Sequence, residues 1–342
     1  MEPSILFSII LPIWHAGDDL REALHSLRHI DFPPERFEVI VVGVHGDSLS
    51  KTTVQKIATE AAFPIRFVEG PKRHRAAQLN IACRSAQGSI LVFSDDDCVF
   101  RSDWLTSLEQ VFDRETELGI VGGADELETD GSAFSLALDY VLQSFIGTGG
   151  IRRPTSLNVG KYYPRLWNMA VPREIAWNVA LGRVGEPAQI FNEALIPHVH
   201  EDVELSKRIE HSGKRIVFAP EVRVGHRRDT TFLRFLWRGV EKAQTSRMLG
   251  THRVAHGVLA LGVISLGILT VGSIFSVFLK NMLMGIGGVY GMLLFLAGID
   301  GARRTRNFKT FLLIPGLFLS VHFARGIGYL LPLFKKQTRT GI

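Results

Sequence analysis

The stretch from Ile90 to Cys98 reads Ile-Leu-Val-Phe-Ser-Asp-Asp-Asp-Cys, so four apolar residues lead through one serine into three consecutive carboxylates. Such an apolar run is typical of a strand that is buried on both faces of a sheet. Carboxylates at the end of a strand repel one another unless a cation or solvent offsets their charge. Oxygen ligands on alternate residues point the same way, so Asp95 and Asp97 can hold Mg²⁺ or Mn²⁺ against phosphates. The alternative is an acidic turn or a cap for a helix near Trp104.

Apolar runs and helical patterns before this stretch predict an α/β fold with the order βαβαβαβ. Three further β-rich runs occupy residues 5–11, 39–42 and 65–68. Between the strands, apolar residues recur at helical spacing in three stripes, namely Leu20, Ala23, Leu24, Leu27; then Val54, Ile57, Ala58, Ala61; and then Leu79, Ala82, Ala86, with Gly88 ending the last helix. Continuous apolar strands predict a mainly parallel sheet, which places ligands beyond the carboxyl ends of its strands. We therefore expect the chemistry just after Pro12, Val42, Val68 and Phe93.

The composition changes sharply near residue 250. From Gly250 onward there are ten Lys or Arg residues and one acidic residue, which leaves 29 basic and 33 acidic residues before it, so the excess of positive charge lies in the tail. These basic residues flank apolar runs, which indicates an anionic membrane surface and argues against nucleic acid as a partner. The first residues, Met1-Glu2-Pro3, are acidic and not basic, and the first apolar run lacks a cleavage site, so we expect no signal peptide. Cys83 and Cys98 show no metal-ligand spacing and are expected to be buried thiols of a reducing compartment.

Three apolar runs in the tail predict two or three membrane helices. The run from Val258 to Leu279 is uncharged and exceeds the roughly 20 residues that a hydrocarbon core requires. Residues 282–299 form a second run that is rich in glycine. Residues 311–334 form a third, which contains Pro315, His322 and Arg325 and either crosses the membrane or re-enters it.

Basic residues around these runs predict the orientation of the chain. Arg247 and Arg253 precede the first run, and four more basic residues separate the second run from the third. This pattern places the soluble part on the cytoplasmic side. Before the first run we expect an interfacial helix whose lipid-facing residues are Phe232, Leu233, Phe235, Leu236 and Val240.

A second acidic pair, Glu201 and Asp202, stands at the start of a predicted helix that ends near Ser212 and Gly213. Carboxylates at a helix start are stabilised by the helix dipole, so this pair alone indicates a capped surface helix.

Taken together, the motifs resemble the family 2 glycosyltransferases with a GT-A fold, from about Phe7 to about His226 and on into the membrane tail. The segments that carry the resemblance to the family's strands and basic helix start are residues 7–12, 38–42 and 75–80. Ser94 to Cys98, with residues 103–105, resembles the family's metal motif and downstream helix. Residues 168–171 and the pair Glu201-Asp202 resemble the acceptor-side segment and the catalytic motif, and residues 215–220 with His226 resemble the closing strand.

Two segments depart from the family pattern. After the first strand the chain reads Trp14-His15-Ala16-Gly17-Asp18 where the family usually has Asn and acidic residues. After the second strand, Gly43-Val44-His45-Gly46 stands where an Asp pair is usual, and Asp47 follows. These acids contact the base or ribose in the family, so the donor nucleotide stays open. Gln244 to Met248 resembles the Gln-x-x-Arg-Trp motif of processive members without its Trp.

The resemblance implies a metal-dependent, inverting, hexosyltransferase-like enzyme of EC class 2.4. It moves a sugar from a nucleotide-sugar donor to a lipid-linked or glycan acceptor, in cell-surface polysaccharide or glycolipid synthesis. Asp202 is the expected base, with Glu201 in support. The expected ligands of a divalent cation, Mg²⁺ or Mn²⁺, are Asp95, Asp97 and His226. The donor is expected to contact Pro12, Trp14, Arg75, Asp95 and Asp96.

We expect a catalytic domain over residues 1–229, an interfacial amphipathic helix over 230–253, and a membrane region over 254–342. The expected location is a bacterial inner membrane or its equivalent, with several spans and a cytoplasmic catalytic domain. One alternative is a non-catalytic, transferase-like binding protein, motivated by the missing base-contacting acids, although both acidic motifs are kept. The other is a nucleotidyltransferase that shares the architecture. It needs a Gly-rich basic loop after the first strand, and residues 15–19 contain no Lys or Arg.

Overall fold

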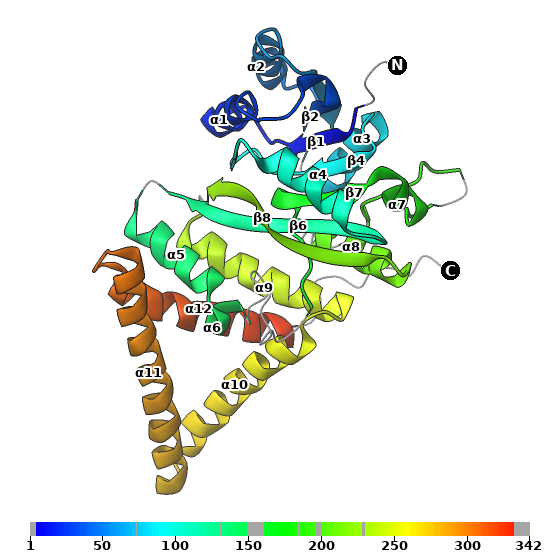
Figure 1. The fold of residues 1–342 in the computed structure, drawn as a ribbon. Coiled ribbons are helices and arrows are strands. Elements are labelled where there is room, and N and C mark those ends of the chain that lie inside the picture. Colours follow the sequence, from blue (N-terminus) through cyan, green and yellow to red (C-terminus); the bar gives the residue numbers. More distant parts are fainter. Residues whose placement is uncertain are drawn as a thin grey trace. The chain divides into compact units, whose positions relative to one another are not determined.

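The computed structural model describes residues 5–72, 74–129, 131–148, 161–182, 185–195, 200–227 and 230–331. The chain divides into two compact units (Figure 1). The first comprises Met1–Glu128 and Tyr162–Arg227 and is built around a sheet, and the second comprises Thr129–Lys161 and Arg228–Ile342. The described part of the second unit is helical. A segment inserted into the sequence of the sheet unit therefore belongs, by its packing, to the helical unit.

The sheet has eight strands in the order β3-β2-β1-β4-β7-β6-β8-β5. Their bounds are β1 Phe7–Pro12, β2 Phe37–Val44, β3 Ile65–Gly70, β4 Ile90–Phe93, β5 Cys98–Phe100, β6 Leu118–Glu128, β7 Met169–Pro172 and β8 Arg215–Arg227. The first four strands are parallel, as the sequence predicts. The whole sheet is mixed, because β7 pairs antiparallel with β4 and β6, and β5 pairs antiparallel with β8. The α/β architecture that the sequence predicts is confirmed.

Helices cover both faces of this sheet. They are α1 Asp18–Leu27, α2 Ser48–Ala58, α3 Arg75–Ser85, α4 Trp104–Arg114, α7 Arg173–Asn178 and α8 Glu201–His211, with short 3₁₀ turns η1 Pro34–Arg36 and η2 Leu166–Asn168. One core cluster holds buried residues of α1 and α4, and a second holds those of α3 and α8. Of the predicted stripes, the one on α1 is fully buried, whereas on α2 only Val54 is buried.

Gly88 has a different role from the predicted one. The third helix already ends at Ser85, three residues earlier. A Cβ atom on Gly88 would lie 2.6 Å from the backbone nitrogen of Ser8, so only glycine allows this close approach to β1. A glycine is required at position 88 because the chain packs closely against β1, and not because it caps a helix.

The helical unit contains α5 Ala133–Gln143, α6 Phe145–Thr148, α9 Phe232–Leu249, α10 Arg253–Gly272, α11 Val277–Thr305 and α12 Thr310–Leu330. By length and composition, α10, α11 and α12 are each able to span a membrane. The predicted boundary of the first run is wrong, because Val258 to Leu279 crosses the break between α10 and α11. The Ser276 side chain caps α11 there by accepting from the Leu279 amide at 3.4 Å, which a hydropathy pattern does not reveal.

Helix α12 is central to the helical unit and contacts α5, α9, α10 and α11. Figure 1 shows it running across the ends of α10 and α11, which diverge from their short connection. Buried residues of α5, α9, α11 and α12 form one apolar cluster that includes Phe235. The predicted lipid-facing surface of α9 is therefore wrong at Phe235, whereas Leu233 is exposed.

Two glycines let α12 approach its neighbours closely. A Cβ atom on Gly328 would lie 2.6 Å from the carbonyl oxygen of Val240, and one on Gly326 would lie 2.8 Å from that of Leu259. Gly316, on the same helix, has no such neighbour within 4 Å. Packing of α12 thus depends on small residues at specific positions, as is common between membrane helices.

The matched pair Gly328→Ala and Gly316→Ala tests this packing. We expect Gly328→Ala to destabilise the protein by about 1–3 kcal/mol, because the added carbon overpacks against backbone. Gly316→Ala should be neutral or stabilising by up to about 1 kcal/mol, because alanine favours helix in open space. Thermal unfolding of both variants in the same detergent measures the difference, and equal stability of the two would refute the close contact.

Candidate active site

The carboxylate-rich turn follows β4 directly and is fixed on both sides by backbone hydrogen bonds. The Ser94 amide donates to the Ile10 carbonyl at 3.1 Å, and the Cys98 amide donates to the Asp95 carbonyl at 3.3 Å. The chain then enters β5, where Cys98 lies opposite His226 of β8. The turn therefore lies at the carboxyl end of β4, where the parallel strands predict a ligand site.

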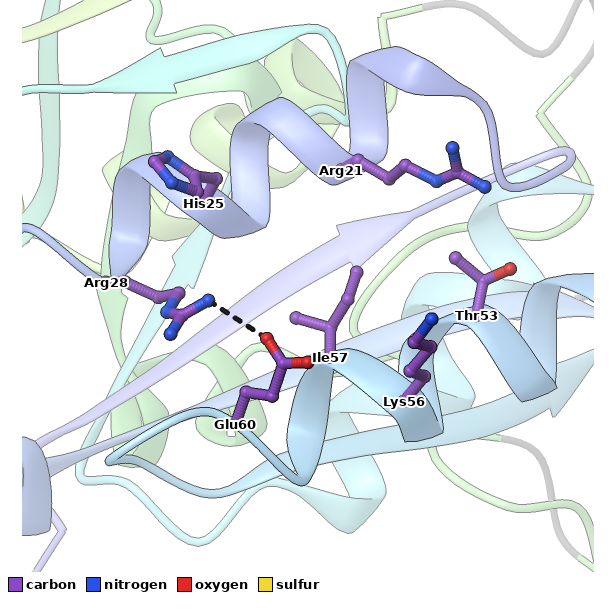
Figure 2. A pocket seen from close by; sticks show the side chains of 7 residues that line it. All are labelled: Arg21, His25, Arg28, Thr53, Lys56, Ile57 and Glu60. Carbon is purple, nitrogen blue, oxygen red and sulfur yellow. Dashed lines mark hydrogen bonds and ion pairs between the residues drawn. The ribbon is translucent and has the colours of Figure 1, made fainter.

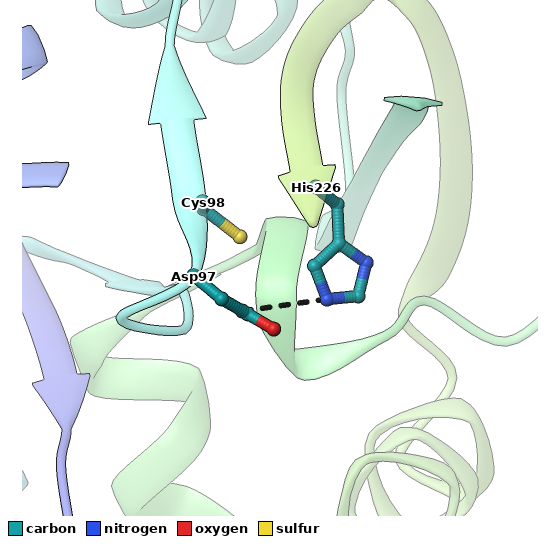
Figure 3. Close-up of side chains that lie close together, drawn as sticks. All are labelled: Asp97, Cys98 and His226. Atoms are coloured by element: carbon teal, nitrogen blue, oxygen red, sulfur yellow. Dashed lines mark ion pairs between the residues drawn. The ribbon is translucent and has the colours of Figure 1, made fainter. Parts of the chain in front are cut away.

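Pairing of β5 with β8 brings His226 against the acidic turn (Figure 3). The His226 Nε2 atom lies 3.4 Å from Asp97 Oδ1, and the His226 ring stacks on the ring of Trp167 at a centroid distance of 4.9 Å. Stacking on Trp167 and the pairing of β8 with β5 together fix the position of the imidazole. Two of the three predicted metal ligands, Asp97 and His226, are thus neighbours.

Ligand atoms of Asp97, Cys98 and His226 all lie within 4.8 Å of one another. Within the described part of the chain, Asp97 Oδ1 and His226 Nδ1 are buried without a hydrogen-bond partner. Carboxylate oxygens suit the hard cations Mn²⁺ and Mg²⁺, and an imidazole nitrogen can complete a Mn²⁺ site, whereas the buried thiol of Cys98 is a soft group beside them. The residues present therefore fit a divalent cation.

Cys98 is the site residue that the sequence pattern did not reveal. It is buried, as expected, but its Sγ atom also faces the Asp97–His226 pair. Burial raises the pKa of this thiol, and the neighbouring charges of Asp95 and Asp97 add to the rise. Only the β5–β8 register, in which Cys98 pairs with His226, could have indicated this proximity.

Arg75 lies beside Asp95, one of five neighbouring acidic groups that we call the acidic cluster: Asp95, Asp96, Asp97, Glu201 and Asp202. It is the first residue of α3 and forms an ion pair with Asp95. Burial lowers the pKa of the Arg75 guanidinium. The carboxylates of Asp95, Glu201, Asp202 and Asp97 outweigh this effect, so that the pKa is raised. The prediction placed Asp95 on the cation; in the structure this carboxylate contacts Arg75.

The acidic cluster carries more negative than positive charge. Burial raises the pKa of Asp95, with Arg75 opposing the rise and Asp97 adding to it. The pKa of Asp96 is also raised, to about 7, by burial and by the charges of Asp97 and Asp95. Burial likewise raises the pKa of Glu201. Ionised carboxylates crowded in this way are stabilised by a bound cation, which lowers the pKa of the groups around it.

The pair Glu201-Asp202 begins α8 and is not solvated. Glu201 is 4% and Asp202 6% exposed, so the alternative of a capped surface helix is wrong. Asp202 accepts hydrogen bonds from the amides of Val203 at 2.8 Å and Leu166 at 3.4 Å, and Arg165 approaches it at 3.6 Å. The Glu201 Oε1 atom has no hydrogen-bond partner among the residues that the structure describes.

Trp14 follows β1, which ends at Pro12, and its side chain is 49% exposed. The alternative of a core aromatic residue is therefore wrong. The loop around it is held from α2, because the Ala16 amide donates to Ser50 Oγ at 2.6 Å and the Ser50 hydroxyl donates to Asp47 at 2.6 Å. Asp47, the late acid after the second strand, thus caps α2 and ties two loops of the strand edge together.

Asn168 is a scaffold residue. Its side-chain amide donates to the carbonyls of Ala124 at 3.1 Å and Val222 at 3.0 Å, and its carbonyl oxygen accepts from the Trp104 indole at 3.1 Å. These bonds join β6, β8 and α4 just before β7. They fix the position of the neighbouring Trp167, against which His226 stacks.

A separate surface pocket lies between α1 and α2 (Figure 2). It is lined by basic and polar side chains, and Arg28 pairs with Glu60 across it at 3.4 Å. None of its lining residues belongs to the acidic cluster, and none was predicted as a site residue.

Parts of this chain are similar to known proteins. Residues 8–171 match the family described as Glycosyl transferase family 2. Glycosyltransferase AglE of Haloferax volcanii is 24% identical over 98 residues, which cover 29% of this chain and 32% of AglE. Poly(ribitol-phosphate) beta-N-acetylglucosaminyltransferase TarS of Staphylococcus aureus (strain Mu50) is 30% identical over 95 residues, covering 27% of this chain and 16% of TarS. The matched segments thus span about a third or less of these relatives.

The fold is also found among solved structures. The mannosyltransferase PcManGT from Pyrobaculum calidifontis, in complex with GDP-Man and Mn²⁺, superposes with a TM-score of 0.53. The match covers 96% of this chain and 88% of that chain at 16% sequence identity, so it supports the fold alone. The strand order and this superposition agree on a GT-A architecture, and residues 8–171 are similar to glycosyl transferase family 2.

Proposed function

We propose that this protein is a membrane-anchored, metal-dependent, inverting glycosyltransferase that moves a sugar from a nucleotide-sugar donor to a lipid-linked or glycan acceptor. The observation that carries the proposal is that Arg75 pairs with Asp95, while the charges of Asp97, Glu201 and Asp202 also raise the pKa of Arg75. Two of these carboxylates belong to the turn after β4 and two to the start of α8, so the cluster joins the expected donor and acceptor sides.

On the donor side, Asp97 and His226 are the proposed ligands of Mg²⁺ or Mn²⁺, with Asp95 beside them. When bound, such a cation offsets the charge that builds on the leaving diphosphate. Arg75 supplies a second positive charge, and a guanidinium suits phosphate oxygens. Trp14, exposed at the end of β1, is proposed to stack on the nucleobase, with Pro12 and Asp96 lining the same edge.

On the acceptor side, Asp202 is the proposed general base. It takes the proton of the acceptor hydroxyl while the oxygen forms a bond to the anomeric carbon. The bond from that carbon to the diphosphate breaks in the same step, and the nucleotide diphosphate leaves with the electron pair. A single displacement of this kind inverts the anomeric configuration. Glu201 is proposed to support Asp202 from the same helix start.

The helical unit is proposed to anchor the enzyme in a bacterial inner membrane or its equivalent, with the sheet unit in the cytoplasm. Three helices of suitable length and composition support an anchor. Tethering at a membrane favours an acceptor that is itself in the membrane, because enzyme and acceptor then share one surface and the effective concentration of the acceptor near the enzyme rises. A role in cell-surface polysaccharide or glycolipid synthesis follows from such an acceptor.

The experiment uses the full-length protein in lipid nanodiscs with a panel of labelled nucleotide sugars. We expect one donor to release free nucleotide in a metal-dependent way. With a polyprenyl phosphate or a lipid-linked glycan present, the label should move into the organic extract, and NMR of the product should show the inverted anomer. Tight donor binding without turnover toward either acceptor class would contradict catalysis and favour a binding protein.

A further inference from the structure

Cys98 places a thiol beside the two proposed ligands of the divalent cation. Ligand atoms of Asp97, Cys98 and His226 all lie within 4.8 Å of one another, and Figure 3 shows the Cys98 sulfur pointing toward the other two side chains. A carboxylate and an imidazole serve Mn²⁺ or Mg²⁺, but a thiolate is a ligand of softer cations such as Zn²⁺. The glycosyl transfer proposed above does not use this thiol.

The pairing of β5 with β8 sets the position of the sulfur. Cys98 lies directly opposite His226 in this antiparallel pair. Directly opposite side chains project from the same face of a sheet, with their Cβ atoms about 4.5–5.5 Å apart. The Arg227 amide also donates to the Asp97 carbonyl at 3.0 Å, so the pairing continues to the residue before β5. The strand register therefore holds all three ligand groups on one scaffold, and no loop has to close to bring them together.

The separation of the carboxylate and the imidazole matches a tetrahedral zinc site. Bonds of about 2.0–2.3 Å to Zn²⁺ place any two ligand atoms of such a site about 3.3–3.8 Å apart. Asp97 Oδ1 and His226 Nε2 lie 3.4 Å apart. The Cys98 sulfur lies at most 4.8 Å from a ligand atom of each neighbour, so an approach of about 1 Å or less completes the set.

The ligand atoms are free to accept a cation. Within the described part of the chain, Asp97 Oδ1 is buried and has no hydrogen-bond partner, despite its closeness to His226. Cys98 is 1% exposed, and its Sγ atom donates weakly, over 3.8 Å, to the carbonyl oxygen of Trp167. A thiol is a weak donor, so little is lost when its sulfur binds a cation in place of this contact. Burial of the unpaired carboxylate oxygen costs free energy, which a bound cation offsets.

We propose that Asp97, Cys98 and His226 bind Zn²⁺ through one atom each, and that the thiol makes this site select Zn²⁺ over Mn²⁺ and Mg²⁺. The sulfur releases its proton to solvent and forms the bond to the cation with its electron pair. The soft thiolate strengthens the binding of Zn²⁺ far more than that of Mg²⁺ or Mn²⁺, which prefer oxygen ligands. Three protein ligands leave the fourth position of a tetrahedral ion open.

The expected consequence is that Zn²⁺ blocks the enzyme. Zn²⁺ and the activating cation share Asp97 and His226, so the two cannot be bound at the same time. A tetrahedral ion with three protein ligands also has fewer positions for diphosphate oxygens than an octahedral Mg²⁺ ion. This consequence rests on the proposed function, whereas the binding of Zn²⁺ does not.

Cobalt spectroscopy tests the thiol ligand directly. Full-length protein is stripped of divalent cations with a chelator and titrated with Co²⁺, which occupies tetrahedral sites as Zn²⁺ does and shows a charge-transfer band in the near ultraviolet when a thiolate binds it. We expect this band in wild type and in the control Cys83→Ser, and its loss in Cys98→Ser. Cys83 is also a buried thiol, but it lies in the core cluster that holds residues of α3 and α8.

Competition titrations measure the selectivity of the site. Zn²⁺ is titrated against a chelating dye, and Mn²⁺ binding is followed by electron paramagnetic resonance, in wild type and both variants. Serine keeps the size of the side chain but removes the soft sulfur. We expect the affinity for Zn²⁺ to fall by at least about 10–100-fold in Cys98→Ser, the loss that mutation of groups merely supporting metal ligands already causes. The affinity for Mn²⁺ should change by no more than a few-fold.

A wild-type Co²⁺ spectrum without the charge-transfer band, or an equal ratio of Zn²⁺ to Mn²⁺ affinity in wild type and Cys98→Ser, would overturn the proposal. If Cys98→Ser unfolds, which its melting temperature without metal shows, Cys98→Ala serves in its place. Nucleotide release with Mn²⁺, measured on the same samples, tests the proposed function separately. A protein that binds Zn²⁺ through Cys98 yet transfers no sugar supports the zinc site and contradicts the proposed function.

Discussion

Replacing Asp202 by Asn is expected to lower kcat by about 10²–10⁴-fold while leaving donor affinity nearly unchanged. The amide cannot take the proton of the acceptor hydroxyl, although it keeps the shape of the carboxylate. The contacts from Leu166 and Val203 remain possible, because an amide oxygen still accepts hydrogen bonds. Steady-state kinetics of sugar transfer and calorimetric donor titration together measure the two effects.

Glu204→Gln is the matched control for this change. Glu204 lies on the same helix, two residues further along, and pairs with Arg208 at 2.8 Å. Its replacement should leave kcat within a few-fold of wild type, since it is not part of the acidic cluster. Asp202 is not the base if Asp202→Asn keeps near wild-type turnover, or if the variant loses donor binding and not turnover of the bound donor.

The second large effect is expected from Asp97→Asn. Asp97 is the carboxylate next to His226 and Cys98, so the change removes a charged ligand while the β5–β8 pairing stays intact. We expect the affinity for the donor in the presence of the metal to fall by about 10–100-fold or more. Mutation of residues that only support metal ligands already causes losses of this size. Calorimetric titration of the donor with and without Mn²⁺ measures this loss.

Asp103→Asn serves as the control for the metal site. Asp103 is exposed, precedes α4 and pairs weakly with Arg101 at 3.5 Å. Its replacement should leave the metal dependence as in wild type. Unchanged metal-dependent affinity in Asp97→Asn would refute the assignment of this carboxylate.

Much of the sheet could be predicted because burial on both faces requires continuous apolar strands. β4 has the predicted bounds, and the other three predicted strands differ only at their ends. The antiparallel strands β5 and β7 were not predicted as strands; β5 contains only three residues, and β7 contains four and ends in a proline. Their direction is set by pairing with β8, β4 and β6, which are distant in sequence.

The packing of α5 illustrates another limit of the sequence. Its buried residues Ala137, Leu138 and Val141 lie in a helix that interrupts the sheet unit, yet their apolar cluster includes residues of α11 and α12. The sequence of α5 alone does not indicate that its buried face packs against helices that follow about 160 residues later in the chain. A chain truncated after the sheet unit would expose this face, so every test proposed above uses the full-length protein.

In the candidate site, the acidic motifs could be found because their chemistry is carried by consecutive residues. Asp95 to Asp97 and Glu201-Asp202 were each identified; Arg75 pairs with Asp95, and charges from both groups raise the pKa of Arg75. Cys98 was missed because its proximity to His226 depends on strand register. The role of Asp47 as the cap of α2 was also missed; its carboxylate accepts from the Ser50 amide at 3.0 Å.

Metal add-back tests the central claim most directly. Full-length protein in nanodiscs is stripped of divalent cations with a chelator, and nucleotide release from the preferred donor is followed as Mn²⁺ is returned. The account predicts that sugar transfer and the binding of Mn²⁺ rise together, and that Asp97→Asn loses both. Full transfer by the stripped protein, with no bound cation, would contradict the assignment of the acidic cluster as a metal-dependent glycosyl transfer site.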